Sequence, residues 1–416
     1  MRRGISNCRN FVELAGTAGI AGSALMAAPA AADPLGITMD DLNNLPEPGP
    51  ELVGHYKKML KQNLLKEGET FVFATKMVFD PDMVVAMMTA AGELQATGAH
   101  VAVFPKITGN TYESGLSPWH WELYAGADLL FNTSLGASAG LPGAVTAYGD
   151  AIADHPYRTD FEYISRVGSK TRWLSFGYDL ERQRRYFPTA ERRGRTLAGA
   201  KLLQNCGDTT GELRITSDAG SDLRMNMQGR PGHAQYGIAD FAGRWDNFGY
   251  GCVACSSNED TAEGKLVLQP GDHIRNLYPA VIDEHVTLNF KGGSVTSIEG
   301  GKTAAAFDTH LRSFNDPASL VLGHFGWGTH EATEYTSEGD GGNYHHNDEG
   351  SLLMAIGMNY GHGLGGPDMG YSGLGDTQNI APNHSHIAMW NCNVYVNGNK
   401  ELENGRVSRA AGGSGY

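Results

Sequence analysis

The sequence has few cysteines, and outside its N-terminus it lacks a long hydrophobic run. Only five of its 416 residues are cysteine, and Cys252 and Cys255 form a lone CxxC pair. A structural zinc site ordinarily needs a second such pair or suitably spaced histidines, so we expect two small buried residues here and no disulfide framework. No apolar run after residue 32 approaches the length of a transmembrane helix, which predicts a soluble mature protein without stable membrane insertion.

Basic charge is also scarce. The chain has 32 lysines and arginines against 46 aspartates and glutamates, a formal net charge of -14. Such a surface repels phosphate backbones, so we expect no nucleic-acid partner. The hydrophobic fraction of 41% and the charged fraction of 19% are those of a globular protein, and the length allows two domains.

The first 32 residues differ in composition from the rest. A head with three arginines precedes a small-residue apolar run over 11–28, and an alanine triplet follows at 30–32. This three-part pattern predicts a secretory signal peptide, although a membrane anchor is an alternative. Cys8–Glu13 resembles the twin-arginine export motif, but Cys8 replaces its first arginine. We expect an exported, periplasmic protein, with a cytoplasmic protein as the alternative.

The N-terminal half has the pattern of alternating strands and helices. Residues 71–79 form an apolar strand candidate, Asp80 and Pro81 begin a helix that runs to about residue 97, and 100–104 form a second strand. Strand, helix and strand in this order predict a parallel βαβ unit. We therefore expect an α/β domain over residues 33–205.

The chain after Cys206 has short strand candidates separated by glycine-containing turns. They cover residues 212–216, 222–225, 265–268, 286–290 and 295–298, and a helix candidate follows at 302–314. Gly292 and Gly293 between two of these strands are a hairpin signature. We expect an α+β, mainly antiparallel, C-terminal domain over residues 206–416 that carries a metal site.

Histidines gather in this second half, where ten of the fifteen lie at or beyond His273. His324 ends an apolar run and is followed by glycines, and His384 and His386 begin another apolar run. Residues i and i+2 of a strand share a face, so the last two histidines could bind one ion. Neutral imidazole suits iron, zinc, copper and nickel. We expect the polar stretch 344–349 to be a hydrated loop.

The order of several short motifs resembles one enzyme family. The motifs lie at 216–223, 243–248, 258–264, 323–328, 385–387 and 394–398. Together they resemble the 2,5-dihydroxypyridine 5,6-dioxygenases, which are related in fold to thermophilic leucyl aminopeptidases of the aminopeptidase T type. The resemblance extends loosely over residues 50–410.

The resemblance implies a metal centre with one altered position. The dioxygenases hold one Fe(II) with two histidines and an aspartate, and His324 and His386 match the two histidines. The aspartate position, two residues after His386, is Ala388. The third ligand could be His384 or His330, a water or substrate anion could complete a two-histidine site, or the iron site could be lost.

The resemblance therefore implies a non-haem dioxygenase with one Fe(II) per chain, which opens a hydroxylated N-heteroaromatic ring such as 2,5-dihydroxypyridine. Its partners would be dioxygen and a small aromatic anion, and the family tends to form homo-oligomers. His233 and Tyr236 are candidates for acid/base or hydrogen-bonding groups toward the substrate. The alternatives are a metallo-aminopeptidase or other metal-dependent hydrolase, with metal near Glu259 and Glu263, and a non-catalytic binding protein that has lost the metal.

Overall fold

The computed structural model describes 49–76, 80–103, 106–108, 111–113, 117–133, 156, 163–164, 167–168, 170–175, 180–275, 277, 280–331, 348–359, 379 and 381–415. The expected signal peptide at 1–32 lies outside these ranges, as do His345 and His346 of the expected loop. Within them, no helix is long and apolar enough to cross a membrane.

A five-stranded parallel sheet has the order β10-β6-β5-β1-β2. Its strands are β1 (Thr70–Lys76), β2 (Thr97–Val103), β5 (Leu129–Asn132), β6 (Arg172–Ser175) and β10 (Trp245–Asn247). Helix α4 (Pro81–Glu93) connects β1 to β2, and the Asp80 carboxylate caps it by accepting from the Asp82 amide at 2.9 Å. The predicted βαβ unit is confirmed, with the helix ending four residues earlier than expected.

Helices cover both faces of this sheet. Successive strand residues point to opposite faces, so each strand contributes to two apolar clusters. Phe71 and Phe73 of β1 pack with α3 (Pro50–Gln62) and α4. Val72 and Ala74 lie in a second apolar cluster with α5 (Pro118–Gly126). That second cluster also contains Ala254 from a neighbouring sheet, so the parallel sheet and its neighbour share a core.

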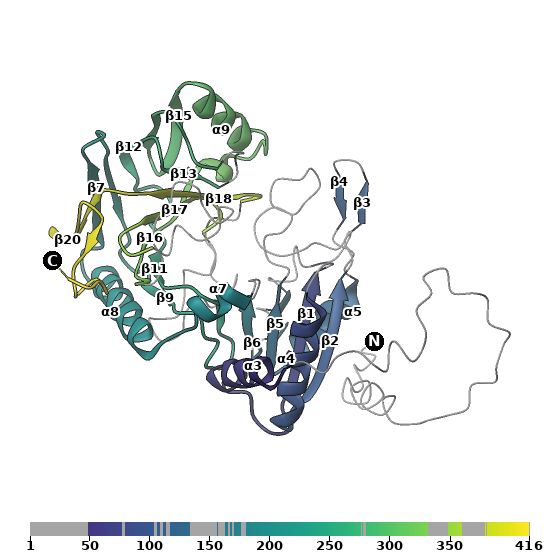
Figure 1. The fold of residues 1–416 in the computed structure, drawn as a ribbon. Helices are drawn as coiled ribbons and strands as arrows, with labels where there is room; N and C mark the ends of the chain where they lie inside the picture. Colours follow the sequence, from purple (N-terminus) through teal and green to yellow (C-terminus); the bar gives the residue numbers. More distant parts are fainter. Residues whose placement is uncertain are drawn as a thin grey trace, which may run out of the picture.

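The neighbouring sheet has six antiparallel strands in the order β13-β18-β17-β16-β11-β9. Its strands are β9 (His233–Gln235), β11 (Cys252–Cys255), β13 (His273–Ile274), β16 (Leu322–Gly328), β17 (Leu352–Gly357) and β18 (His384–Met389). Figure 1 shows it between the parallel sheet and an eight-stranded sheet. One face of the six-stranded sheet therefore packs on the parallel sheet, and the other face packs on the eight-stranded sheet.

The eight-stranded sheet has the order β15-β14-β12-β8-β7-β19-β20-β21. Its strands are β7 (Glu212–Ser217), β8 (Asp222–Asn226), β12 (Glu263–Leu268), β14 (Val286–Lys291), β15 (Ser294–Gly300), β19 (Cys392–Val396), β20 (Asn399–Glu403) and β21 (Arg406–Val407). The predicted hairpin at Gly292 and Gly293 is confirmed, and both glycines have positive φ. Helices α8 (Ala190–Gly207) and α9 (Lys302–Arg312) contribute to the core beside it.

Smaller elements complete the described chain: the hairpin β3 (Lys106–Thr108) and β4 (Thr111–Glu113), α7 (Leu180–Arg185) and the 3-10 helix η1 (Pro317–Leu320). The expected combination of a parallel sheet with mainly antiparallel sheets is therefore present. The division of the chain at residue 205 stays a prediction. Strand β10 comes from the second half of the chain yet pairs with β6 of the first, with Trp245 opposite Trp173.

Candidate metal centre

Three buried histidines lie together on the six-stranded sheet. His324 comes from β16, and His384 and His386 come from β18. Each offers a ring nitrogen, and these nitrogens all lie within 4.8 Å of one another. The ring centroids are 4.9 Å apart for His324 and His384, 5.4 Å for His324 and His386, and 4.6 Å for His384 and His386. One ion could contact all three rings.

The register of the strands brings these side chains together. His324 pairs with Ala355 of the intervening strand β17, and Ala355 pairs with His386 on its other side. Residues directly opposite one another in a sheet point to the same face. Ala355 therefore separates the two imidazoles with only a methyl group, while Gly357 stands opposite His384. The small side chains of β17 leave room between the rings.

A β-bulge at Gly323 turns His324 toward this face. The register shifts between Leu322, which pairs with Ile356, and His324, which pairs with Ala355. In a regular strand these two residues would share a face. Here Leu322 belongs to the apolar core and His324 lies on the opposite side. A Cβ on Gly323 would lie 2.7 Å from the Gly357 carbonyl oxygen and 2.8 Å from that of Met358, so the bulge requires glycine.

The structure fixes which nitrogen of His384 can bind a metal. Its Nδ1 lies 2.6 Å from the carbonyl oxygen of Met358, which can only accept a hydrogen bond. Nδ1 therefore carries the proton, and Nε2 carries the lone pair. Burial lowers the pKa of His384 to about 3, so the ring is neutral at physiological pH. A neutral, oriented imidazole is the form that coordinates metals.

Asparagine side chains hold the ends of β17 and β18 around this carbonyl. The side-chain amide of Asn383 donates to the backbone carbonyl of Ile356. The backbone N–H of Met358 donates to the backbone carbonyl of Asn383 at 2.8 Å. Asn379 donates to the carbonyl of Gly357 at 2.8 Å. These bonds fix the backbone at Met358 and so orient His384.

The donor set fits a transition metal. Three neutral imidazoles suit iron, zinc, copper or nickel, whereas calcium and magnesium prefer oxygen ligands. The group contains no carboxylate among the described residues. Ala388 lies two residues beyond His386 on the same strand, and its neighbours across the sheet are Leu353 and His273.

One positive charge lies beside the cluster. Arg275 follows the edge strand β13, and its backbone N–H donates to the carbonyl of His386 at 3.1 Å. Its Nη1 lies 3.4 Å from Nδ1 of His386. The side chain is half-buried, and no carboxylate of the described chain lies within 4.0 Å of it. Within the described part of the chain, the cluster therefore has a cation at its edge and no carboxylate in the ligating group.

Comparison with known proteins places this chain in a family. The model of a family described as 2,5-dihydroxypyridine 5,6-dioxygenase matches residues 161–409, more than half of the chain. This chain belongs to the 2,5-dihydroxypyridine 5,6-dioxygenase family. A protein of that name from Pseudomonas putida is 29% identical over 358 residues, which are 85% of this chain and 94% of the relative.

Solved structures agree with the family assignment. The structure of the dioxygenase from Pseudomonas putida KT2440 matches with a TM-score of 0.67 and 25% identity, over 86% of this chain and 96% of that one. Wild-type AmpT from Thermus thermophilus matches with a TM-score of 0.56 and 14% identity, over 86% and 98% of the two chains. The second likeness shows a shared fold alone.

The two candidate proton-transfer residues lie apart from the histidine cluster. His233 is buried on β9 and pairs with Ala254, which in turn pairs with Gly326 of β16. It thus shares the face of the cluster, two strands or roughly 10 Å from β16. Tyr236 lies in the opposite core, where its hydroxyl donates to Asp240 at 3.0 Å and burial raises its pKa. The catalytic role of both residues stays a prediction.

His330, the other candidate for a third ligand, is also buried but lies elsewhere. Its ring packs edge-on against Tyr186 at 5.5 Å, and its backbone bridges to Asp348. Among the described residues it does not join the group of three. Of the two candidates, His384 is therefore the one that the fold brings to His324 and His386.

The glutamates that a hydrolase would use are occupied by structural contacts. Glu259 forms an ion pair with Arg230 at 2.7 Å and accepts from the Asn359 amide at 2.6 Å. Glu263 is exposed and accepts from the backbone N–H of Gly292 at 2.7 Å. Neither belongs to the metal-ligating group found in the described chain.

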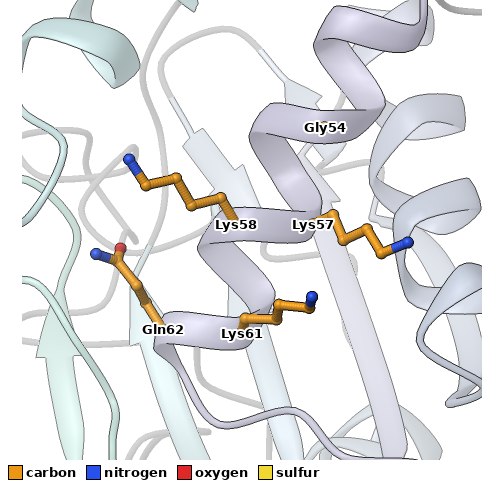
Figure 2. Close-up of a pocket in the computed structure, with 5 residues that line it drawn as sticks. All are labelled: Gly54, Lys57, Lys58, Lys61 and Gln62. Carbon is orange, nitrogen blue, oxygen red and sulfur yellow. The ribbon is translucent and has the colours of Figure 1, made fainter.

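A surface hollow of about 470 Å³ on α3 has different chemistry. Gly54, Lys57, Lys58, Lys61 and Gln62 line it, and Figure 2 shows Lys57 and Lys58 pointing to different sides of the helix. Lys57 pairs with Glu93 at 2.7 Å, and the Lys58 ammonium lies over the ring of Phe187. The hollow offers no metal ligand or acid–base pair.

Three residues that shape the site are missing from the sequence-based expectations. Ala355 and Gly323 have no chemistry of their own, and only the strand register shows that they make room for and turn His324. Arg275 carried a usable signal, because it follows His273 by two residues beside a short apolar stretch. Only the pairing of β13 with β18 places it against His386.

Proposed function

We propose that this chain is a ring-cleaving dioxygenase that holds one Fe(II) with His324, His384 and His386. Its substrate is a hydroxylated N-heteroaromatic ring such as 2,5-dihydroxypyridine. The observation that carries the proposal is the meeting of three buried imidazoles within 4.8 Å in a chain of this family. The donor set suits iron, and no acidic residue of the described chain is positioned to bridge two ions.

In this ligand set, a histidine on the same strand takes the place of the carboxylate in the family pattern. Ala388 cannot bind a metal, but His384 lies two residues from His386 in the other direction, on the same face of β18. His384 would therefore serve as the third ligand from the same strand face, in place of the family's aspartate. Bound iron would supply open coordination positions at which substrate and dioxygen meet.

The protein's own residues supply position and environment. The Met358 carbonyl holds His384 in one tautomer, and Ala355 and Ala388 leave space beside the rings. Three neutral ligands leave the charge of the ion uncompensated, which favours an anionic substrate. His233, on the same face, is the proposed proton-transfer residue, because imidazole is the side chain most often used for general acid–base catalysis.

Anaerobic iron titration of four proteins tests the ligand set: wild type, His384→Ala, Ala388→Asp and the double variant. We expect one iron per wild-type chain and none in His384→Ala. The double variant should recover iron, because an aspartate at 388 restores the family's ligand set. The control is His310→Ala, which removes a half-buried histidine that contacts Ser385 of the same strand at 3.2 Å. It should leave iron binding unchanged.

Oxygen uptake by the iron-loaded proteins tests the activity. We expect uptake with 2,5-dihydroxypyridine and not with peptide substrates. Two divalent ions per chain together with peptide hydrolysis would establish the hydrolase instead. A wild type that binds no metal and consumes no oxygen with any hydroxylated ring would leave the binding-protein alternative.

We also propose that residues 1–32 direct export and are dispensable for folding, and that two domains meet near residue 205. A protein that starts at Asp33 should be soluble and folded and should bind iron as the full chain does. If only the full chain is soluble, the targeting proposal is wrong.

A further inference from the structure

Arg275 is bound to His386 by a hydrogen bond that a metal would break. A guanidinium has only donors, so its contact with Nδ1 of His386 requires a lone pair on that nitrogen. A neutral imidazole has one such lone pair in its plane. The contact therefore exists only while the lone pair of His386 is not given to a metal.

Loading the site removes this acceptor whichever nitrogen binds. If Nδ1 coordinates the ion, its lone pair is used. If Nε2 coordinates, the lone pair lies there and Nδ1 carries a proton that faces the guanidinium. In both cases the Nη1 donor of Arg275 loses its partner, and no carboxylate of the described chain lies within 4.0 Å to replace it.

The backbone prevents Arg275 from moving far from the site. Its N–H donates to the carbonyl of the same His386, and it continues the alternation of β13, in which His273 pairs with Ala388. The half-buried side chain thus stays on the face of the three histidines. A half-buried guanidinium with a donor turned toward a metal is a site for an anionic oxygen.

We propose that Arg275 is a specificity-determining residue that binds an ionised oxygen of the ring substrate once the metal is in place. The oxygen belongs to a planar ring, either as an ionised ring hydroxyl or as a carboxylate on the ring. The planar guanidinium can donate two parallel hydrogen bonds to a carboxylate and a charge-assisted hydrogen bond to an ionised hydroxyl. This inference rests on the metal centre proposed above.

The test measures binding without turnover, on zinc-loaded full-length protein. The ligands are 2,5-dihydroxypyridine, 5-hydroxypyridine-2-carboxylate, and 3-hydroxypyridine, which lacks a second oxygen. Calorimetry compares wild type with Arg275→Gln and Arg275→Lys. The matched control is Arg214→Gln, an exposed arginine of β7 that pairs with Asp222.

We expect Arg275→Gln to weaken binding of 2,5-dihydroxypyridine and 5-hydroxypyridine-2-carboxylate by about 10- to 100-fold, the effect of losing a charge-assisted hydrogen bond. Binding of 3-hydroxypyridine should not change. Zinc itself should bind more tightly, because a nearby positive charge is gone. Arg275→Lys should be intermediate, since it keeps the charge without the planar fork. A mere structural defect would weaken zinc and every ligand together.

The two sources of the oxygen are distinguished by the ligands. A loss confined to the carboxylate ligand assigns Arg275 to a ring carboxylate, and a loss for 2,5-dihydroxypyridine as well assigns it to a ring oxygen. Unchanged affinity for both in a zinc-loaded variant overturns this inference and leaves the proposed function standing. A wild type that binds no zinc or iron overturns both.

Discussion

The two faces of strands β16, β17 and β18 carry different kinds of side chain on one shared backbone. On one face, Phe325, Trp327 and Met354 pack into the large core shared with the eight-stranded sheet. On the other, His324 and Ala355 belong to the histidine cluster and its surroundings. Because consecutive residues alternate, the same short segments supply both faces.

The difference shows that the residues that stabilise these strands and the candidate metal ligands lie on opposite faces of the same sheet. Large apolar side chains on one face pack the strands onto the core, and on the other face Ala355 and Gly357 leave space for the imidazoles. A change on the apolar face should alter the free energy of unfolding, and a change on the histidine face should alter metal binding.

Ala355→Leu should have the largest effect on the histidine face. The added carbons project between His324 and His386, which flank Ala355 on the two neighbouring strands. We expect metal binding to be lost, with a cost in unfolding free energy of only about 1–3 kcal/mol from overpacking. Metal analysis and chemical denaturation measure the two effects. Ala355→Ser, which adds one small atom, is the control and should keep the metal.

Trp327→Ala should do the reverse on the apolar face. The side chain is fully buried, and its Nε1 donates to the carbonyl of Ala411 at 2.9 Å. We expect the free energy of unfolding to fall by about 3–5 kcal/mol. Metal stoichiometry should be unchanged in the fraction that remains folded. Loss of the metal from well-folded Trp327→Ala protein would show that the two faces are coupled.

Gly323→Ala should affect both stability and metal binding, because the bulge at Gly323 places Leu322 on the apolar face and His324 on the histidine face. The new methyl group would meet two carbonyl oxygens at 2.7 and 2.8 Å, so the strand must shift. We expect a loss of about 1–3 kcal/mol in unfolding free energy together with weaker metal binding. Gly54→Ala in α3, where a Cβ meets nothing within 4 Å, should instead be neutral or slightly stabilising.

Asp272, at the edge of the same sheet, should give a smaller and pH-dependent effect. Burial raises its pKa to about 7, although two backbone N–H groups, those of Gln269 and Trp390, donate to it. A raised pKa stabilises the folded protein below the unfolded value near 4 and loses that contribution as the pH rises through 7. The free energy of unfolding should therefore fall between pH 4 and 7.

Asp272→Asn should flatten this part of the pH profile, measured by denaturation at pH 5 and pH 8. Part of the gain at pH 8 will be offset, because the asparagine NH₂ cannot accept the second backbone bond. An equal slope in wild type and variant would assign the pH dependence to other groups.

The sequence predicted the individual helices and strands better than the pairing of the strands. The βαβ pattern, the hairpin at Gly292 and the strand nature of His384–Met389 follow from local periodicity. The pairing of β16 with β18 through β17 does not, because β17 is an uninterrupted apolar run that gives no register of its own. His324 and His386 could be named from the motif order, whereas the bulge that brings His324 to the cluster follows from long-range packing.

Strand β10 has a consequence for how the chain is made. It forms the edge of the parallel sheet beside β6, yet residues 245–247 are synthesised after α8 and the first strands of the eight-stranded sheet. Until then, the hydrogen-bonding edge of β6 is open to other chains. Trp245 then packs near Trp173, with ring centroids 6.4 Å apart, and its indole N–H donates to Ser175 at 2.9 Å. The growing chain is therefore most prone to aggregation after β6 has been synthesised and before β10 has been added.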